Sequence, residues 1–361
     1  MKELTMPYKK TKILTSESNQ FLRSHVLMIY TGGTLGMVFD PKSRSLMPFD
    51  FEEILNNLPE LHQLEFELTI LALPELIDSS NVKPSVWIEL AQIIKSNYEK
   101  FNAFVILHGT DTMAYTASAL SFLLENLSKP VILTGAQLPI GVARSDAREN
   151  LITALEIASM KTDGKPLVPE VAIYFNSFLL RGNRAKKKES SQFNAFSSEN
   201  YPTLAEAGVS IDFNFPFIKP YYPHLPLNVH HKLEEQVVIL KLFPGLNQAI
   251  IHAIFSTKNL RGVVLETYGA GNVPSNDWFL DELEQAIKNN IVILNVSQCD
   301  GGKVLQGHYE TSSRLNTIGV VSGSDITTEA AITKMMFLLA KESDIERVKA
   351  QLGKSICGEM S

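Results

Sequence analysis

The clearest candidate for chemistry near the start of the chain is a glycine turn flanked by two threonines. Residues 30–34 read Tyr-Thr-Gly-Gly-Thr and directly follow a short apolar run. In an open parallel sheet, ligands bind beyond the carboxyl ends of the strands, where the chain turns. The glycines let the backbone approach a ligand closely, and Thr31 and Thr34 offer hydroxyl groups at the same place. A glycine turn with two solvated threonines would give the same pattern, so this segment alone leaves both interpretations open.

A second segment of this kind lies at residues 107–113, which read Leu-His-Gly-Thr-Asp-Thr-Met. It follows another apolar run and begins a helical pattern, so Asp111 or Thr112 could cap that helix. Because both segments follow strands of one predicted sheet, they could instead face a single pocket, where Thr110 and Asp111 would act chemically. His108 could be a base, but a lone histidine at a strand end is more often structural, and we assign it no catalytic role.

Residues 181–188 form a compact basic loop, Arg-Gly-Asn-Arg-Ala-Lys-Lys-Lys. A solvated loop is the default interpretation of such a run. In a chain with 33 basic residues, 39 acidic residues and a net charge of −6, the loop also permits contact with an anionic substrate. A third possibility is that one lysine is buried beside Asp111, loses its proton and acts as a base toward a hydroxyl group.

Other catalytic patterns are absent from the sequence, which contains no GxGxxG, P-loop, HExxH or GxSxG motif. Histidine, cysteine and carboxylate residues show no metal-ligand spacing, so we expect no metal and no cofactor. Cys299 follows an apolar run and is interpreted as a core cysteine rather than a nucleophile. With Cys357 as the one other cysteine, the chain has no disulfide framework and fits a reducing compartment.

The elements that must position these segments follow from the hydrophobic pattern. Short apolar runs rich in β-branched residues recur at 26–30, 104–107, 131–134, 171–175, 237–242, 262–266 and 291–296. Helical patterns lie between several of them, such as the shared face of Met113, Ala117, Leu120 and Leu124. This alternation predicts an α/β fold, with a large N-terminal domain on a mostly parallel sheet and a smaller C-terminal α/β domain.

A domain boundary is predicted near residue 220. Four prolines lie within residues 216–226, which excludes a helix or a central strand there. We therefore predict an N-terminal extension at 1–23, a large domain at 24–212, a proline-rich linker at 213–234 and a C-terminal domain at 235–361. The extension is expected to be disordered or to form an arm.

Composition and hydropathy exclude several classes of protein. The acidic balance disfavours a nucleic-acid partner held by phosphate contacts. The first apolar run is too short for a signal peptide, and no stretch approaches the ~20 apolar residues that span a bilayer. The sequence therefore predicts a cytoplasmic protein with neither a membrane nor a nucleic-acid partner.

Taken together, the motifs resemble those of the asparaginase/glutaminase family of amidohydrolases, specifically the cytoplasmic type I bacterial L-asparaginases. Besides the two threonine segments, the matching motifs are Leu-Thr-Gly-Ala-Gln-Leu-Pro at 133–139, Arg-Gly-Asn-Arg at 181–184 and Tyr-Gly-Ala-Gly-Asn at 268–272. They occur in the family's order, and the resemblance covers residues 24–361. It implies hydrolysis of L-asparagine to L-aspartate and ammonia without a cofactor.

The resemblance also implies roles for individual residues. Thr34 matches the family's nucleophile, which forms a β-acyl-enzyme, and Thr110 and Asp111 match its second threonine and the neighbouring acid. Lys187 matches the family's lysine, with Lys186 and Lys188 as alternatives one position away. The residues implied in holding the substrate are Asp78, Ser79, Ser80, Thr110, Asp111 and Asn272.

The chemistry agrees with these roles. A threonine hydroxyl is a poor nucleophile at neutral pH and needs a neighbouring base. In the implied mechanism, Thr110, Asp111 and Lys187 form a relay that supplies this base, with the lysine desolvated by burial and held by the carboxylate. Asp111 would also pair with the α-ammonium group of the substrate, and backbone N–H groups near Thr110 would stabilise the oxyanion.

The resemblance further implies assembly and regulation. Asn272 matches a residue that reaches the site of a neighbouring subunit, so activity would need a homodimer or a dimer-of-dimers homotetramer. Type I members also have an allosteric asparagine site in the smaller domain, for which residues 267–272 and Lys303 are the candidates in this chain.

One position departs from the family pattern. Residues 44–48 read Arg-Ser-Leu-Met-Pro, which places Leu46 where the family has a tyrosine, and no tyrosine lies between residues 31 and 97. An alternative function is therefore an asparagine-binding regulator with little or no turnover. Another is an amidotransferase subunit that supplies ammonia to a tRNA-bound partner, which would require an extra N-terminal domain and a basic surface.

Overall fold

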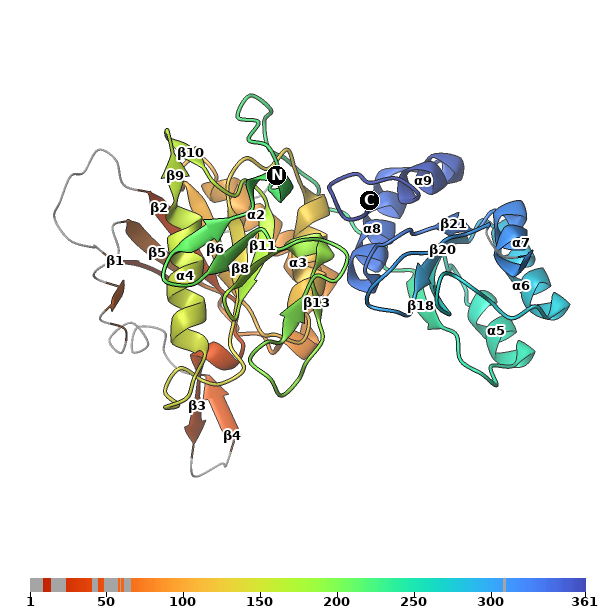
Figure 1. Cartoon of the computed structure of the whole chain (residues 1–361), viewed down its shortest axis with the longest axis horizontal. Helices are drawn as coiled ribbons and strands as arrows, with labels where there is room; N and C mark the ends of the chain where they lie inside the picture. Colours follow the sequence, from red (N-terminus) through yellow and green to blue (C-terminus); the bar gives the residue numbers. More distant parts are fainter. Residues whose placement is uncertain are drawn as a thin grey trace. The chain divides into compact units, whose positions relative to one another are not determined.

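The computed structural model describes residues 9–13, 24–40, 45–48, 58, 60–61, 66–307 and 310–361. They form two compact units, each with its own sheet (Figure 1). The first unit comprises Met1–Ser198 and Pro202–His230, and the second comprises Glu199–Tyr201 and His231–Ser361. The predicted fold class is confirmed, because the first unit has a large, mostly parallel sheet and the second a smaller parallel sheet. Among the described residues, no helix has the length and apolar character needed to cross a membrane.

A nine-stranded sheet forms the centre of the first unit, in the order β1-β5-β2-β6-β8-β11-β12-β15-β16. Five central strands run parallel: β5 (Glu67–Ala72), β2 (His25–Tyr30), β6 (Ala103–Leu107), β8 (Val131–Thr134) and β11 (Val171–Phe175). The antiparallel additions are β1 (Lys9–Ile13), β12 (Phe178–Arg181), β15 (Ala205–Ala207) and β16 (Ile211–Phe213). Every residue of β6, β8 and β11 is buried, which explains why the sequence shows continuous apolar runs there.

The N-terminal residues contribute a strand to this sheet. β1 pairs antiparallel with β5, from Lys9 opposite Ala72 to Ile13 opposite Leu68. Apart from β1, residues 1–23 of the predicted extension lie outside the described part of the structure.

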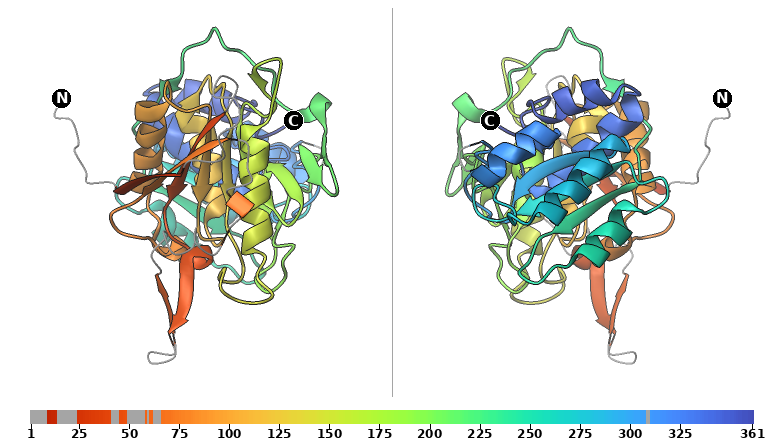
Figure 2. Two further views of the ribbon diagram at one scale, coloured as in Figure 1. Left: turned by 90° about the vertical axis from the view of Figure 1, so that its left-hand side faces the viewer. Right: turned by 90° about the vertical axis from the view of Figure 1, so that its right-hand side faces the viewer.

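Helices connect the parallel strands of the first unit. They are α2 (Pro84–Asn97), α3 (Met113–Leu123) and α4 (Ala147–Ser159). α4 packs across β2, β6, β8 and β11, and α2 packs against α3 (Figure 2). A hairpin of β3 (Met37–Asp40) and β4 (Ser45–Pro48) extends away from the sheet. The predicted linker at 213–234 contains β17 (Asn228–Val229), which pairs with β7 (Leu124–Glu125) of this unit.

The second unit has four parallel strands, β18 (Val237–Lys241), β19 (Gly262–Thr267), β20 (Val292–Ser297) and β21 (Val321–Ser322). Its helices are α5 (Gln248–Phe255), α6 (Asp277–Lys288), α7 (Glu310–Ile318), α8 (Thr328–Lys341) and α9 (Ile345–Leu352). Asn247, Thr327 and Asp344 cap α5, α8 and α9 with side-chain oxygens that accept backbone N–H groups. These caps fix where the helices start.

The prediction that Cys299 is a core cysteine is wrong, because its side chain is exposed. β20 ends at Ser297, and the chain then turns into a loop in which the Cys299 N–H donates to Ser297 Oγ over 3.0 Å. The apolar run before Cys299 belongs to the strand alone, so it does not carry the cysteine into the core.

Candidate active site

The glycine turn after β2 brings three loops of the first unit into contact. Gly32 and Gly33 have φ angles of +124° and +92°, which L side chains rarely adopt. A methyl group on Gly32 would lie 2.4 Å from Ile77 O, and one on Gly33 would lie 2.6 Å from Gly109 N. Only glycine fits at these two positions, and the absence of side chains lets the turn pack directly on the loops after β5 and β6.

Thr34 begins the next turn, the 3-10 helix η1 (Thr34–Gly36). The Tyr30 hydroxyl donates to Gly36 O over 3.2 Å, and Ile140 N–H donates to Leu35 O over 3.3 Å. Burial raises the pKa of Tyr30 to about 12, so its hydroxyl remains a neutral donor. These bonds fix the backbone directly after Thr34, whose side chain is half-buried.

The predicted substrate loop packs against the same turn. Asp78 caps η3 (Ser79–Asn81), because its Oδ1 accepts the N–H and the hydroxyl of Ser80, each over 2.9 Å. Ser79 is buried and Ser80 is exposed. A methyl group on Gly109 would lie 2.5 Å from Ser79 Oγ, so this loop also touches the segment after β6. Three predicted segments therefore meet at the carboxyl edge of the sheet.

Lys187 completes this group of residues. It lies in β13 (Lys186–Lys187), which pairs with β14 (Phe196–Ser197). Its Nζ donates to Thr110 Oγ1 over 2.8 Å and to Asp111 Oδ1 over 2.7 Å. The Lys187 side chain is 17 % exposed and that of Asp111 is 64 % exposed, so the carboxylate remains open to solvent. Within the basic loop, Lys187 is thus the lysine bonded to both predicted partners.

The prediction that Asp111 or Thr112 caps α3 is right about the position of Thr112 but wrong about the bond, because the Thr112 side chain makes no capping bond. Thr112 occupies the N-cap position of α3, but its hydroxyl donates to Ser79 O over 2.7 Å. The Asp111 carboxylate is paired with Lys187. Both side chains have tertiary partners that local capping rules cannot anticipate.

The interpretation of residues 181–188 as a solvated loop is also wrong for its first half. Arg181, Asn183 and Arg184 are buried. Arg181 Nε lies 2.7 Å from the buried Glu170 Oε2, and its guanidinium also donates to Phe217 O over 2.9 Å. This buried ion pair anchors the segment that leads into Lys187.

His108 is structural, in agreement with the prediction. Burial lowers its pKa to about 4, so the ring is neutral at physiological pH. Its Nδ1 faces Gly109 O at 2.7 Å and therefore carries the hydrogen, which leaves Nε2 to accept from the Thr116 hydroxyl over 2.9 Å. The Trp87 indole N–H donates to the same hydroxyl over 3.0 Å. Both ring nitrogens are thus engaged within the core.

Gln137 is a site residue that the sequence analysis missed, although the motif 133–139 contains it. Thr110 Oγ1 donates to its Oε1 over 3.3 Å. Gln137 also lines a crevice of about 580 Å³ together with Arg144 and Gln192. Its position at a strand end could have indicated it, because Gln137 follows β8 as Thr34 follows β2 and Thr110 follows β6.

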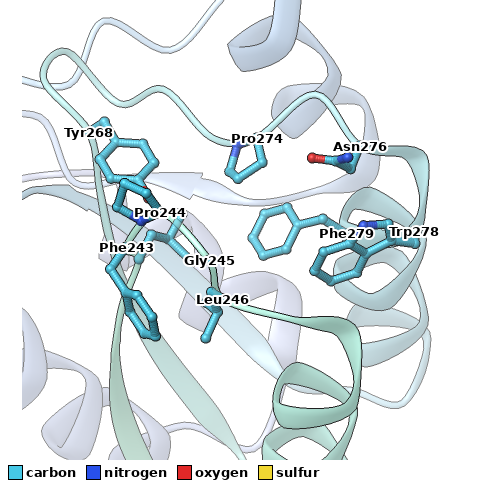
Figure 3. A pocket seen from close by; sticks show the side chains of 10 residues that line it. Phe243, Pro244, Gly245, Leu246, Tyr268, Pro274, Asn276, Trp278 and Phe279 are labelled. Atoms are coloured by element: carbon cyan, nitrogen blue, oxygen red, sulfur yellow. The ribbon is translucent and has the colours of Figure 1, made fainter.

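Asn272 belongs to the second unit, on a turn in which its backbone bonds twice with Tyr268, over 3.0 and 2.8 Å. Its Oδ1 is buried and has no hydrogen-bond partner among the described residues. In the proposed allosteric segment, the Thr267 hydroxyl donates to Asn295 Oδ1 over 2.7 Å, and Lys303 is exposed. An uncharged cavity of about 330 Å³ lies beside this turn, with the rings of Tyr268, Phe243, Phe279 and Trp278 around it (Figure 3).

Leu46 lies in β4, and its backbone is opposite Phe39 of β3; its side chain lies outside the described part of the structure.

In the described ranges, no group of three or more His, Cys, Asp or Glu side chains could hold a metal ion. The arrangement offers a threonine hydroxyl on a rigid turn, a second threonine bonded to a lysine, and an accessible carboxylate.

Comparison with known proteins gives matches over nearly the whole chain. Residues 25–218 match the family model described as "Asparaginase, N-terminal", and residues 236–352 match the "Glutaminase/Asparaginase C-terminal domain". L-asparaginase 1 of Escherichia coli (strain K12) is 39 % identical over 342 residues, which cover 94 % of this chain and 98 % of that protein. The crystal structure of L-asparaginase I from Vibrio cholerae has a TM-score of 0.85 and 38 % identity, covering 94 % of this chain and 99 % of that one. The structure of a probable cytoplasmic L-asparaginase from Campylobacter jejuni has a TM-score of 0.77 and 25 % identity, covering 92 % and 100 %.

Proposed function

This chain belongs to the asparaginase/glutaminase family, and we propose that it is an enzyme that hydrolyses L-asparagine to L-aspartate and ammonia with Thr34 as the nucleophile. We further propose that it acts in the cytoplasm as a homodimer or a dimer-of-dimers homotetramer. The observation that carries the catalytic assignment is the bonding of Lys187 to Thr110 and Asp111, beside the loop on which the Thr34 turn packs.

The first step forms an ester with the enzyme. The relay of Thr110 and Lys187 takes the hydroxyl proton of Thr34 while Oγ1 of Thr34 attacks the side-chain amide carbon of asparagine. Collapse of the tetrahedral intermediate breaks the carbon–nitrogen bond, and the nitrogen leaves as ammonia after receiving the proton. Backbone N–H groups near Thr110 stabilise the oxyanion.

The second step repeats the chemistry with water. The same relay takes a proton from a water molecule, whose oxygen attacks the ester carbon. The ester bond to Thr34 Oγ1 breaks, L-aspartate leaves, and Thr34 recovers the proton. The relay of Thr110 and Lys187 therefore acts in both steps.

Substrate recognition falls to the charged and polar groups around the nucleophile. The exposed carboxylate of Asp111 pairs with the α-ammonium group of asparagine. Asp78, Ser79 and Ser80 hold the α-carboxylate and α-amino groups, and Asn272 acts from a neighbouring subunit.

The experiment that tests this function is ammonia release over a concentration series of L-asparagine, with L-glutamine in parallel. We expect release from asparagine by the wild type and a loss of at least ~10³-fold in Thr34→Ala at unchanged melting temperature. Thr31→Val is the matched control, because the Thr31 hydroxyl is already bonded to Leu107 O over 2.8 Å. Substantial turnover by a clean preparation of Thr34→Ala would remove Thr34 from this role. A sigmoidal response would support an allosteric site.

The second candidate is an asparagine-binding regulator, favoured by Leu46 at the position of the family's tyrosine. It predicts that L-asparagine raises the melting temperature while no ammonia is released. The same concentration series therefore separates the regulator from the enzyme.

A further inference from the structure

The hydrogen bonds around Gln137 run in one direction, which can be assigned atom by atom. A backbone carbonyl only accepts, so the atom 3.0 Å from Gln192 O is Nε2, and Oε1 is the atom that faces Thr110. A protonated lysine only donates, so Lys187 Nζ gives a hydrogen to Thr110 Oγ1. The single hydrogen of the Thr110 hydroxyl is then directed to Gln137 Oε1, over 3.3 Å.

This direction is the reverse of the one that the proposed relay needs. For Lys187 to take a proton through Thr110, its amine must be neutral and must accept the Thr110 hydrogen. Gln137 Oε1 and the neutral amine therefore compete for one hydrogen. The Gln137 acceptor favours the arrangement in which Lys187 is protonated and the relay is at rest.

The Gln137 amide is held firmly enough to play this part. The backbone N–H of Gln137 donates to Asp146 Oδ2 over 3.0 Å, and that of Leu138 donates to Oδ1 over 3.1 Å. Asn150 Nδ2 also bonds to Asp146 Oδ2 over 3.2 Å, and to Gly135 O over 3.0 Å. A side chain whose backbone and far end are both fixed presents its oxygen at a defined place.

We propose that Gln137 is a positioning residue that directs the Thr110 hydroxyl hydrogen and thereby sets the pH at which the relay of Thr110 and Lys187 becomes active. The proposal rests on the proposed function, because Gln137 acts only through Thr110.

Several charged groups surround this chain of bonds. They are Asp111 on Lys187, Asp146 beneath the backbone of Gln137, Arg144 in the same crevice, and the neighbours Lys186 and Lys188. Of the elements that pack against β13, α3 and β14 contain no charged residue in their sequences. None of these groups changes in the variants below, so a shift in the pH profile reports on Gln137.

The test compares two substitutions of opposite character by the pH profile of kcat/KM for L-asparagine. Gln137→Met keeps the length of the side chain and removes the acceptor, so the acid limb moves to lower pH. Relative to its own plateau, this variant gains about three- to tenfold in rate on that limb. Gln137→Glu offers a stronger, charged acceptor, so the acid limb moves to higher pH. Ser190→Glu adds the same charge at an exposed position of the crevice and moves the limb less.

Opposite shifts in Gln137→Met and Gln137→Glu support the proposal, and unchanged limbs or shifts of the same sign overturn it. If a variant is inactive at every pH, the Lys187 Nζ signal is followed by nitrogen NMR across the same pH range, with the same expected directions. Thr110→Val separates this failure from that of the proposed function. If Thr110→Val retains turnover, the relay itself is wrong; if it is inactive while the Gln137 profiles stay unchanged, only the positioning role is lost.

Discussion

Two lysines of this chain form ion pairs of equal length in opposite surroundings. Lys187 Nζ lies 2.7 Å from Asp111 Oδ1, and Lys334 Nζ lies 2.7 Å from Glu359 Oε1. The first pair is 17 % and 64 % exposed at its two side chains, whereas both side chains of the second are fully buried. Distance alone therefore does not indicate function. The accessible pair is open to molecules from solvent, whereas the buried pair is not.

The buried pair fixes the end of the chain to the second unit. Lys334 Nζ also donates to Leu352 O over 2.9 Å and to Lys354 O over 2.6 Å. The Glu359 carboxylate accepts the backbone N–H groups of Ile356 and Cys357. Burial lowers the pKa of Lys334. Burial alone would raise the pKa of Glu359, but the charge and hydrogen bond of Lys334 outweigh it and hold that pKa below its ordinary value.

The largest effect is expected for Lys334→Met. This change leaves the Glu359 carboxylate buried without a counter-charge, which costs about 3–5 kcal/mol of unfolding free energy. Urea denaturation of the whole chain measures it. Lys288→Met is the matched control in the same unit, because its partner Glu284 is exposed and such a pair contributes about 0.3–0.5 kcal/mol. Equal losses of unfolding free energy in the two variants would mean that burial does not make the Lys334 pair more important for stability than the exposed pair.

The converse result is expected for Lys187→Met. Removing the relay lysine lowers kcat for L-asparagine by about 10²–10⁴-fold, the usual contribution of a general base. Its stability changes by less than about 1 kcal/mol, because its partner Asp111 remains solvated. Ammonia release and thermal unfolding on one preparation measure both. If Lys187→Met loses as much unfolding free energy as Lys334→Met but still releases ammonia, the Lys187 pair has a structural role rather than a catalytic one.

Acid titration tests the carboxylate of the buried pair. The pKa of Glu359 is lower in the folded than in the unfolded chain, so its carboxylate stabilises the fold above the ordinary value of 4.5. That contribution is lost as the pH falls through the range below 4.5 toward the folded pKa, at up to about 1.4 kcal/mol per pH unit. Glu359→Gln is therefore expected to flatten the fall in unfolding free energy in this range. A Glu359→Gln variant that keeps the wild-type slope would contradict this account.

The two pairs also show where sequence reasoning succeeds. The choice of Lys187 within the basic loop follows from its spacing to Phe196, and its side chain does bond to Thr110 and Asp111. Its role as a base stays a prediction. Lys334 is hidden, because it lies in an ordinary amphipathic helix and meets Glu359 only after α9 and the tail have folded back. Local periodicity carries no information about such a contact.

The remaining errors have the same physical origin. Cys299, Arg181 and Thr112 were each assigned from their neighbours in sequence, and each has a different environment in the fold. Gln137 lies in a motif whose strand was predicted, yet its partner Thr110 is 27 residues away. The apolar runs that become β2, β6, β8 and β11, and the convergence of the loops after them, follow from pattern. The central strand β5 is not among the predicted runs. Hydrogen-bond partners between loops depend on tertiary packing, which a single sequence does not display.

The smallest effect is expected for Tyr30→Phe. This side chain combines the burial of the Lys334 pair with a position beside the proposed site, like that of the Lys187 pair. The Tyr30 hydroxyl is buried like the pair of Lys334, but it bonds to Gly36 O on the turn that carries Thr34. Its loss removes one buried hydrogen bond, worth about 1 kcal/mol, and loosens that turn. We therefore expect a small fall in unfolding free energy together with a several-fold fall in kcat and little change in KM. A fall in stability with kcat intact would show that the turn is held by Ile140 and the glycines alone, and that burial beside the site has no bearing on the nucleophile.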